Sequence, residues 1–63
     1  MRRLKIIRKQ KGLSQSELAN ILGVSQNTVS QWESGDRSPS ISILKQLTTI
    51  LECSADILLE DVK

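Results

Sequence analysis

The feature that most constrains the fold is a run of twenty-two residues, Ser14–Gly35, in which two short helix patterns flank a glycine. Ser14 and Glu17 have the spacing of a capping box, in which a serine hydroxyl and a carboxylate satisfy backbone N–H groups at the start of a helix. Gly23 provides the positive φ with which such a helix ends, and Ser25 caps the next helix. The run therefore predicts two short helices joined by a tight turn.

The small and apolar residues of this run indicate how the two helices cross. Ala19 must be small because the second helix passes close to it, and Val29 fills the angle between the two helices. Leu18, Leu22 and Trp32 complete the contact. Steep packing of this kind is typical of a helix-turn-helix unit, whose second helix enters the major groove of DNA.

The second helix of this unit has one narrow apolar edge, and amides and hydroxyls cover its remaining face. A purely structural surface helix more often carries Glu and Lys pairs. Amides pair with adenine through two hydrogen bonds, and a threonine methyl group contacts thymine. The expected base-contacting residues are Gln26, Asn27, Thr28 and Gln31. The alternative is that they are ordinary polar surface residues.

Apolar spacing outside this unit predicts three further helices and no strand. Their expected ranges are about Arg2–Gln10, Ile41–Leu51 and Ala55–Leu59. The second helix of the helix-turn-helix unit, called the recognition helix below, is expected to end at Trp32 or Glu33. Ser40 and Ser54 are the expected caps of the last two helices. Leu44, Leu47 and Leu51 are expected to form the main buried stripe of the fourth. The predicted fold class is all-α, a compact bundle of five short helices.

Length and residue types exclude several classes of protein. The 63 residues predict a single domain over residues 1–63, and the apolar runs of two or three residues predict no membrane span. One cysteine, Cys53, and no histidine leave no disulfide, no zinc site and no nucleophile–base pair for an enzyme. We therefore expect no cofactor and no metal, a buried and unreactive Cys53, and a cytoplasmic protein.

Charge is distributed unevenly along the chain. Residues 1–37 carry seven basic and three acidic side chains, whereas residues 38–63 carry two basic and four acidic ones. A basic N-terminal part indicates a polyanionic partner, although an ordinary solvated run of charge explains it equally well.

The run GLSQSELANILGVSQNTVSQWESG, followed by SP and by LKQL and CSADILL, resembles the phage repressor/Cro (Xre-type) helix-turn-helix domains over essentially the whole chain. The resemblance implies a lambda-repressor-like, sequence-specific DNA-binding transcriptional regulator of bacterial or phage origin. A repressor that binds a palindromic operator in double-stranded DNA as a homodimer is the first expectation. The alternatives are an antitoxin or restriction–modification controller with the same fold, and a protein-interaction module that has lost DNA binding.

The resemblance also implies which residues contact the DNA backbone. Gln15 and Ser16 lie at a helix N-terminus, where N–H groups and the helix dipole favour phosphate. Arg37 is the one cation in the loop after the recognition helix. The expected phosphate-contacting residues are Arg8, Gln15, Ser16, Ser34, Arg37, Ser38 and Ser40. Arg8 and Glu33 match an ion pair of the family that orients Arg8 near a phosphate.

Isoleucines in the C-terminal half outnumber the places that one small core offers. Ile41, Ile43, Ile50 and Ile57 cannot all share the face of the leucine stripe, so some are exposed or meet a second subunit. Because the related phage proteins pair through this region, the expected dimer interface is Ile43, Ala55 and Ile57. Core filling is the alternative. No small-molecule ligand is expected.

Overall fold

Five α-helices follow one another along residues 1–60, the part of the chain that this computed structural model describes. They are α1 (Arg2–Gln10), α2 (Gln15–Leu22), α3 (Gln26–Ser34), α4 (Ile41–Leu51) and α5 (Ala55–Leu58). The predicted all-α fold is confirmed, and no strand occurs in this part of the chain. Residues 61–63 of the predicted domain lie outside the described residues.

A serine begins each helix from α2 onward. The hydroxyls of Ser14, Ser25, Ser40 and Ser54 each accept a hydrogen bond from the backbone N–H three residues later. At Ser14 the capping box is complete, because the Glu17 carboxylate also accepts the Ser14 N–H at 3.0 Å. The four predicted caps are therefore confirmed, and local hydrogen bonds explain where these helices start.

Two helix ends differ from the prediction by a residue or two. The helix α3 continues to Ser34 and stops at Gly35, whose φ of 91° lies in the left-handed region and whose N–H bonds the Gln31 carbonyl. The helix α5 ends at Leu58 rather than Leu59. A glycine that adopts the left-handed conformation decides the first difference, since that conformation cannot continue a right-handed helix.

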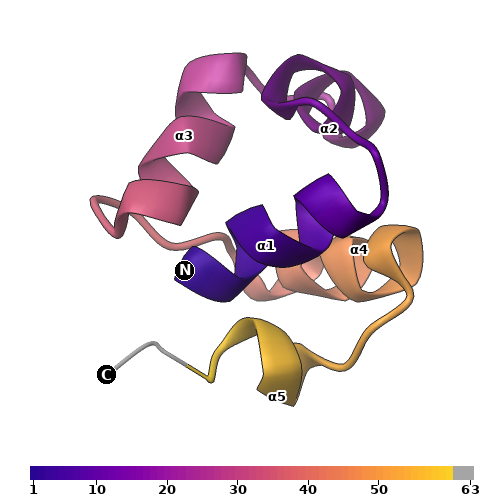
Figure 1. The fold of residues 1–63 in the computed structure, drawn as a ribbon. Helices are drawn as coiled ribbons and strands as arrows, with labels where there is room; N and C mark the ends of the chain where they lie inside the picture. The colour runs from indigo at the N-terminus through magenta and orange to yellow at the C-terminus, as the bar shows by residue number, and fades with distance from the viewer. Residues whose placement is uncertain (61–63) are drawn as a thin grey trace.

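Figure 1 shows α1 between the α2–α3 pair and the α4–α5 pair, and α1 packs against both α3 and α5. The core therefore draws side chains from all five helices. Its buried apolar members are Met1, Leu4, Leu18, Ala19, Leu22, Val29, Trp32, Leu47, Leu51 and Leu58. The five residues predicted to lock α2 against α3 are all among them.

The fourth helix is less regular than its leucine pattern predicts. Leu47 and Leu51 are buried, but Leu44 is only half-buried, and Ile43 and Ile50 share its position at the edge of the core. The prediction that Leu44 belongs to the main buried stripe is therefore wrong, because Leu44 lies at the edge of the core and is only half-buried. The reason is that α4 packs mainly against α5, the shortest helix, which covers only part of its apolar face.

Cys53 is half-buried at the edge of the core, and not fully buried as expected. Burial raises the pKa of the Cys53 thiol, while the charge of Lys11 opposes this effect. The thiol therefore stays protonated near neutral pH, as a structural cysteine does.

No helix among residues 1–60 has the length and apolar character needed to cross a bilayer.

Candidate nucleic-acid interface

The second and third helices form the helix-turn-helix unit expected from the sequence. Gly23 ends α2 with a φ of 73°, and the N–H of Val24 returns to the Ala19 carbonyl at 3.0 Å. Leu18 and Val29 are 0% exposed and Ala19 is 2% exposed, so these three side chains are buried in the core that the two helices share. Such packing holds α3 in one orientation relative to the rest of the domain.

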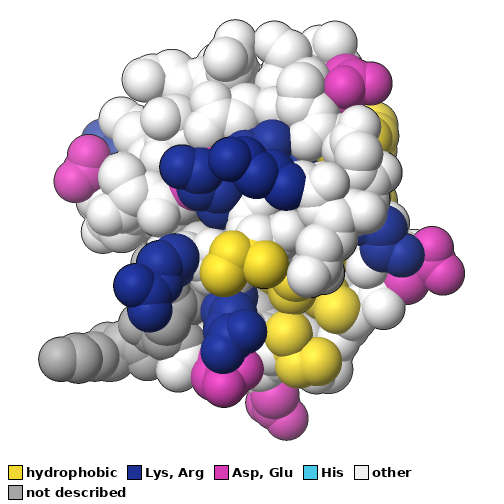
Figure 2. Space-filling view, viewed as in Figure 1, with side chains coloured by type: hydrophobic (Ala, Val, Ile, Leu, Met, Phe, Trp, Pro, Cys, Tyr) yellow, Lys and Arg dark blue, Asp and Glu magenta, His cyan; other side chains and the backbone are white. Residues whose placement is uncertain are grey.

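The outer face of α3 carries the four predicted base-contacting residues. Gln26 and Asn27 are exposed in the first turn, and Thr28 and Gln31 are half-buried. In Figure 2 the surface over α3 is mostly uncharged and polar. Because Val29 and Trp32 anchor the opposite edge in the core, this polar row is the part of α3 that a partner can reach.

Two hydrogen bonds position the first turn of α3. The Ser16 hydroxyl donates to Gln26 Oε1 at 3.0 Å, which links the N-terminus of α2 to the start of α3. The hydroxyls of Ser25 and Thr28 lie 2.8 Å apart. Oε1 of Gln26 accepts this bond with one of its two lone pairs, so its second lone pair and its amide N–H groups are left for a partner.

A buried network joins α1, α2 and α3 behind this face. Arg8 Nε donates to Glu33 Oε2 at 2.7 Å, and Arg8 Nη2 donates to Glu33 Oε1 at 3.3 Å. The two side chains are only 7% and 4% exposed, so the predicted ion pair is present and buried. The third contact of the guanidinium is Arg8 Nη1 to the Leu13 carbonyl at 2.7 Å.

Gln15 belongs to the same network, which the sequence did not predict. Its amide Nε2 donates to Glu33 Oε1 at 3.0 Å. No local pattern could have predicted this bond, because the two residues lie eighteen positions apart on different helices. The bond fixes the side chain at the N-terminus of α2, where phosphate binding was expected. Three of the five guanidinium N–H groups of Arg8 are directed at protein atoms, so a phosphate contact by Arg8 stays a prediction.

The loop after α3 holds the remaining predicted phosphate-contacting residues. Arg37 and Ser38 are exposed, and the N–H of Arg37 bonds the Gln31 carbonyl at 3.2 Å. The Ser34 hydroxyl donates to the same carbonyl at 3.1 Å. The Ser40 hydroxyl accepts the Ile43 N–H and so caps α4, while phosphate contact by Ser40 stays a prediction.

The three predicted dimer residues differ in exposure. Ile57 is 44% exposed, whereas Ala55 and Ile43 are half-buried and Ile43 packs against the core. Leu59 is 39% exposed in the same region and was not predicted to be part of an interface. Residues 1–60 contain no group of His, Cys, Asp and Glu side chains that could hold a metal ion.

The comparisons with known proteins agree with this geometry. A helix-turn-helix family model matches residues 4–58. An uncharacterized HTH-type transcriptional regulator, YazB, of Bacillus subtilis (strain 168) is 39% identical over 55 residues, which cover 87% of this chain and 80% of YazB. The prophage-derived regulator YonR of the same organism is 38% identical over 58 residues, which cover 92% of this chain and 54% of YonR.

A phage protein gives a similar match. Repressor protein C2 of Salmonella phage P22 is 36% identical over 58 residues, which cover 92% of this chain and 27% of that protein. The chain thus spans about half or less of two of these relatives. No solved structure matches it significantly. Because the family model covers most of the residues that build the α2–α3 unit and its supporting helices, the chain belongs to the Cro/C1-type helix-turn-helix family, whose members are DNA-binding transcriptional regulators and not enzymes.

Proposed function

We propose that this chain is a repressor that binds a palindromic operator as a homodimer, with α3 of each copy in the major groove. The observation that carries the proposal is the polar row of α3. Gln26 and Asn27 stand exposed in its first turn, and the opposite edge of the helix is anchored in the core. Residues 1–63 act as one DNA-binding domain, and repression follows when the bound domain excludes RNA polymerase from the promoter.

Within this proposal Gln26, Asn27, Thr28 and Gln31 read base edges. Amides are suited to adenine, and the Thr28 methyl group is suited to thymine. The bond from Ser16 to Gln26 supports this role, because it fixes the amide before DNA arrives and so lowers the entropy lost on binding.

Phosphate contacts flank the reading helix at both ends. Gln15 and Ser16 serve the phosphates near the N-terminus of α2, with Arg8 behind them. Ser34, Arg37, Ser38 and Ser40 serve those near the loop after α3. The Gln15–Glu33 bond supports the first group, and the exposure of Arg37 supports the second. Such contacts set the register of the protein on the duplex and carry no sequence information of their own.

The two copies pair through Ile43, Ala55 and Ile57. The exposure of Ile57 supports this choice, since a large apolar side chain in water is typical of a contact surface. A two-fold axis there would place the two α3 helices one turn of DNA apart, roughly 34 Å, and would require an operator with matching symmetry.

Selection of binding sites from random DNA tests the proposal. We expect one palindromic sequence to be enriched, and a promoter that overlaps it to be silenced in a transcription reaction with purified polymerase. Enrichment of no sequence would contradict base reading, and activation of that promoter would contradict repression.

Affinity measurements on the selected operator then distinguish residues that contact bases from residues that contact phosphates. Gln26→Ala or Gln31→Ala should weaken operator binding by about 1–3 kcal/mol and leave binding to random DNA nearly unchanged. Arg37→Ala is the comparison variant, because it removes an expected phosphate contact. It should weaken binding to the operator and to random DNA, and make the slope of log K against log salt shallower by about 0.9. Equal losses on both DNAs for the two glutamine variants would rule out base reading.

A further inference from the structure

Among the basic residues of α1 and its C-cap, Lys11, two groups of two have different surroundings. One group faces the acidic C-terminal part of the chain. Arg3 Nη2 lies 3.3 Å from Glu60 Oε1, and Lys11 Nζ lies 3.2 Å from Glu52 Oε1. These two cations are compensated, and they hold α1 against the segment after α4 and α5.

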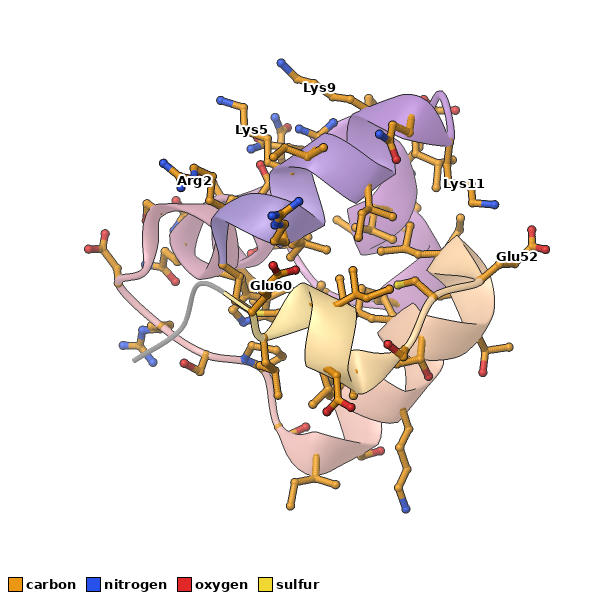
Figure 3. All side chains as sticks on the ribbon, turned by 60° about the horizontal axis from the view of Figure 1, so that its bottom comes forward. Arg2, Lys5, Lys9, Lys11, Glu52 and Glu60 are labelled. Atoms are coloured by element: carbon orange, nitrogen blue, oxygen red, sulfur yellow. The ribbon has the colours of Figure 1, made fainter. Side chains whose placement is uncertain are left out.

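Lys5 and Lys9 form the other group, which we call the lysine face. They lie four residues apart, so they share one side of α1, and both are exposed. Figure 3 shows them pointing away from Glu52 and Glu60. Within residues 1–60 neither lysine has an acidic side chain within ion-pair distance. Two like charges at this spacing repel each other on the helix surface.

The lysine face adjoins the candidate interface. Lys5 lines an open hollow of about 550 Å³ together with Glu33, Ser34 and Gly35, at the C-terminal end of α3. The carboxylate of Glu33 is neutralised there by Arg8. Lys9 follows Arg8 along α1 toward the turn that leads into α2. Figure 2 shows basic side chains gathered over α1, next to the uncharged surface of α3.

We propose that the lysine face, Lys5 and Lys9, binds the DNA backbone that flanks the bases read by α3. The inference rests on the proposed function of α3. Lysine ammonium groups on flexible stems act as point charges toward phosphate and need no particular base. The lysine face therefore adds sequence-independent affinity and lengthens the DNA segment that one domain covers. The opposite face of α1 is neutralised by Glu52 and Glu60 and takes no part.

The test compares two double variants of equal net charge on two duplexes. Lys5→Gln/Lys9→Gln removes the lysine face, and Lys11→Gln/Lys45→Gln removes two positive charges elsewhere on the surface. One duplex ends at the outer base pairs of the selected operator, and the other carries about ten more on each side, one turn of DNA. Affinity is measured between 50 and 200 mM salt, and circular dichroism checks that each variant is folded.

On the long duplex, loss of two phosphate contacts should make the salt slope of the lysine-face variant shallower by about 1.8, so that its affinity falls about 12-fold less than that of the native chain over this salt range. On the short duplex the difference should shrink, and the control variant should keep the native slope on both. A native slope for the lysine-face variant, or equal changes in the two double variants, would overturn the proposal.

Failure of this inference is distinguishable from failure of the proposed function. If Gln26→Ala and Gln31→Ala lose operator specificity while the lysine-face variant behaves as the native chain, only the role of Lys5 and Lys9 is wrong. If the native chain enriches no sequence from random DNA, base reading by α3 fails, whatever the lysines do.

Discussion

At the scale of single residues, the Glu33 carboxylate connects three helices of the candidate interface. It accepts hydrogen bonds from Arg8 of α1 and from Gln15 of α2, while it belongs to α3. A buried ion pair gains little net free energy, because the desolvation of both charges offsets their attraction. Its value here is positional, since one carboxylate sets the place of Gln15 and holds α1 against α3.

Measurements on variants of this pair distinguish its role in positioning Gln15 from its contribution to the free energy of unfolding. Glu33→Ala leaves the Arg8 charge buried without a counter-charge and should lower the free energy of unfolding by about 3–5 kcal/mol. Arg8→Met/Glu33→Leu removes both charges and should recover most of that loss while DNA affinity stays low, because Gln15 has lost its anchor. Urea denaturation and DNA titration of both variants check this. A double variant that is less stable than Glu33→Ala would contradict it.

At the scale of elements, local hydrogen bonds determine where each helix begins. The capping box of α2 also has a titratable member. The Ser14 backbone N–H, and secondly the Ser14 hydroxyl, hold the pKa of the Glu17 carboxyl below its ordinary value. A carboxyl with a lowered pKa stabilises the fold above the pKa of the unfolded chain, and this contribution is lost as pH falls through the pKa of the folded state.

We therefore expect acid to weaken α2 through Glu17. In an NMR titration the Glu17 carboxyl should have a lower pKa in the native chain than in Ser14→Ala, where the hydroxyl is missing. Glu17→Gln should show a smaller loss of stability than the native chain as pH falls from neutral into the range where carboxyls titrate. An unchanged Glu17 pKa in Ser14→Ala would contradict a contribution from that hydroxyl.

The end of α4 is the one place in residues 1–60 where a residue other than glycine has a positive φ. Glu52 ends the helix with a φ of 54°. The left-handed conformation costs a residue with a Cβ roughly 1–2 kcal/mol. Glycine avoids this cost, but it loses roughly 0.5–1 kcal/mol more conformational entropy on folding than alanine does. Glu52→Gly should therefore raise the free energy of unfolding by about 0.5–1 kcal/mol.

Thermal unfolding measures this change. Because Glu52 also pairs with Lys11, the substitution is best made in a Lys11→Gln background, where the ion pair is already absent. A lower stability of Glu52→Gly in that background would contradict the prediction, because it would show that the relief of backbone strain is smaller than the entropy cost of glycine.

At the scale of the whole molecule, the surface divides by chemistry. The α2–α3 side carries amides and hydroxyls, and the α5 region exposes large apolar side chains. Ile57 and Leu59 are 44% and 39% exposed there, and Ile21 is 54% exposed on α2. A dimer through α5 would bury the first two and leave Ile21 in water.

Two exposed isoleucines therefore provide a matched test of the dimer. Ile57→Lys should shift the chain toward monomer in sedimentation across concentration and weaken binding to the full palindrome. Ile21→Lys, an equal change outside the interface, should do neither. A native chain that stays monomeric at millimolar concentration, with an Ile57→Lys variant that binds the operator normally, would exclude this interface.

The sequence by itself determined the elements and the α2–α3 unit. Serine caps and glycine stops act over three or four residues, and apolar spacing shows which side of a helix is buried, so five helices were predictable. The Arg8–Glu33 pair was expected only from the resemblance to a known family. Only the tertiary structure decided that Gln15 bonds Glu33, that Ser16 bonds Gln26, and that Lys5 and Lys9 are left uncompensated. These contacts join different helices, or depend on how one helix is rotated against its neighbours, and packing of the complete core sets that rotation.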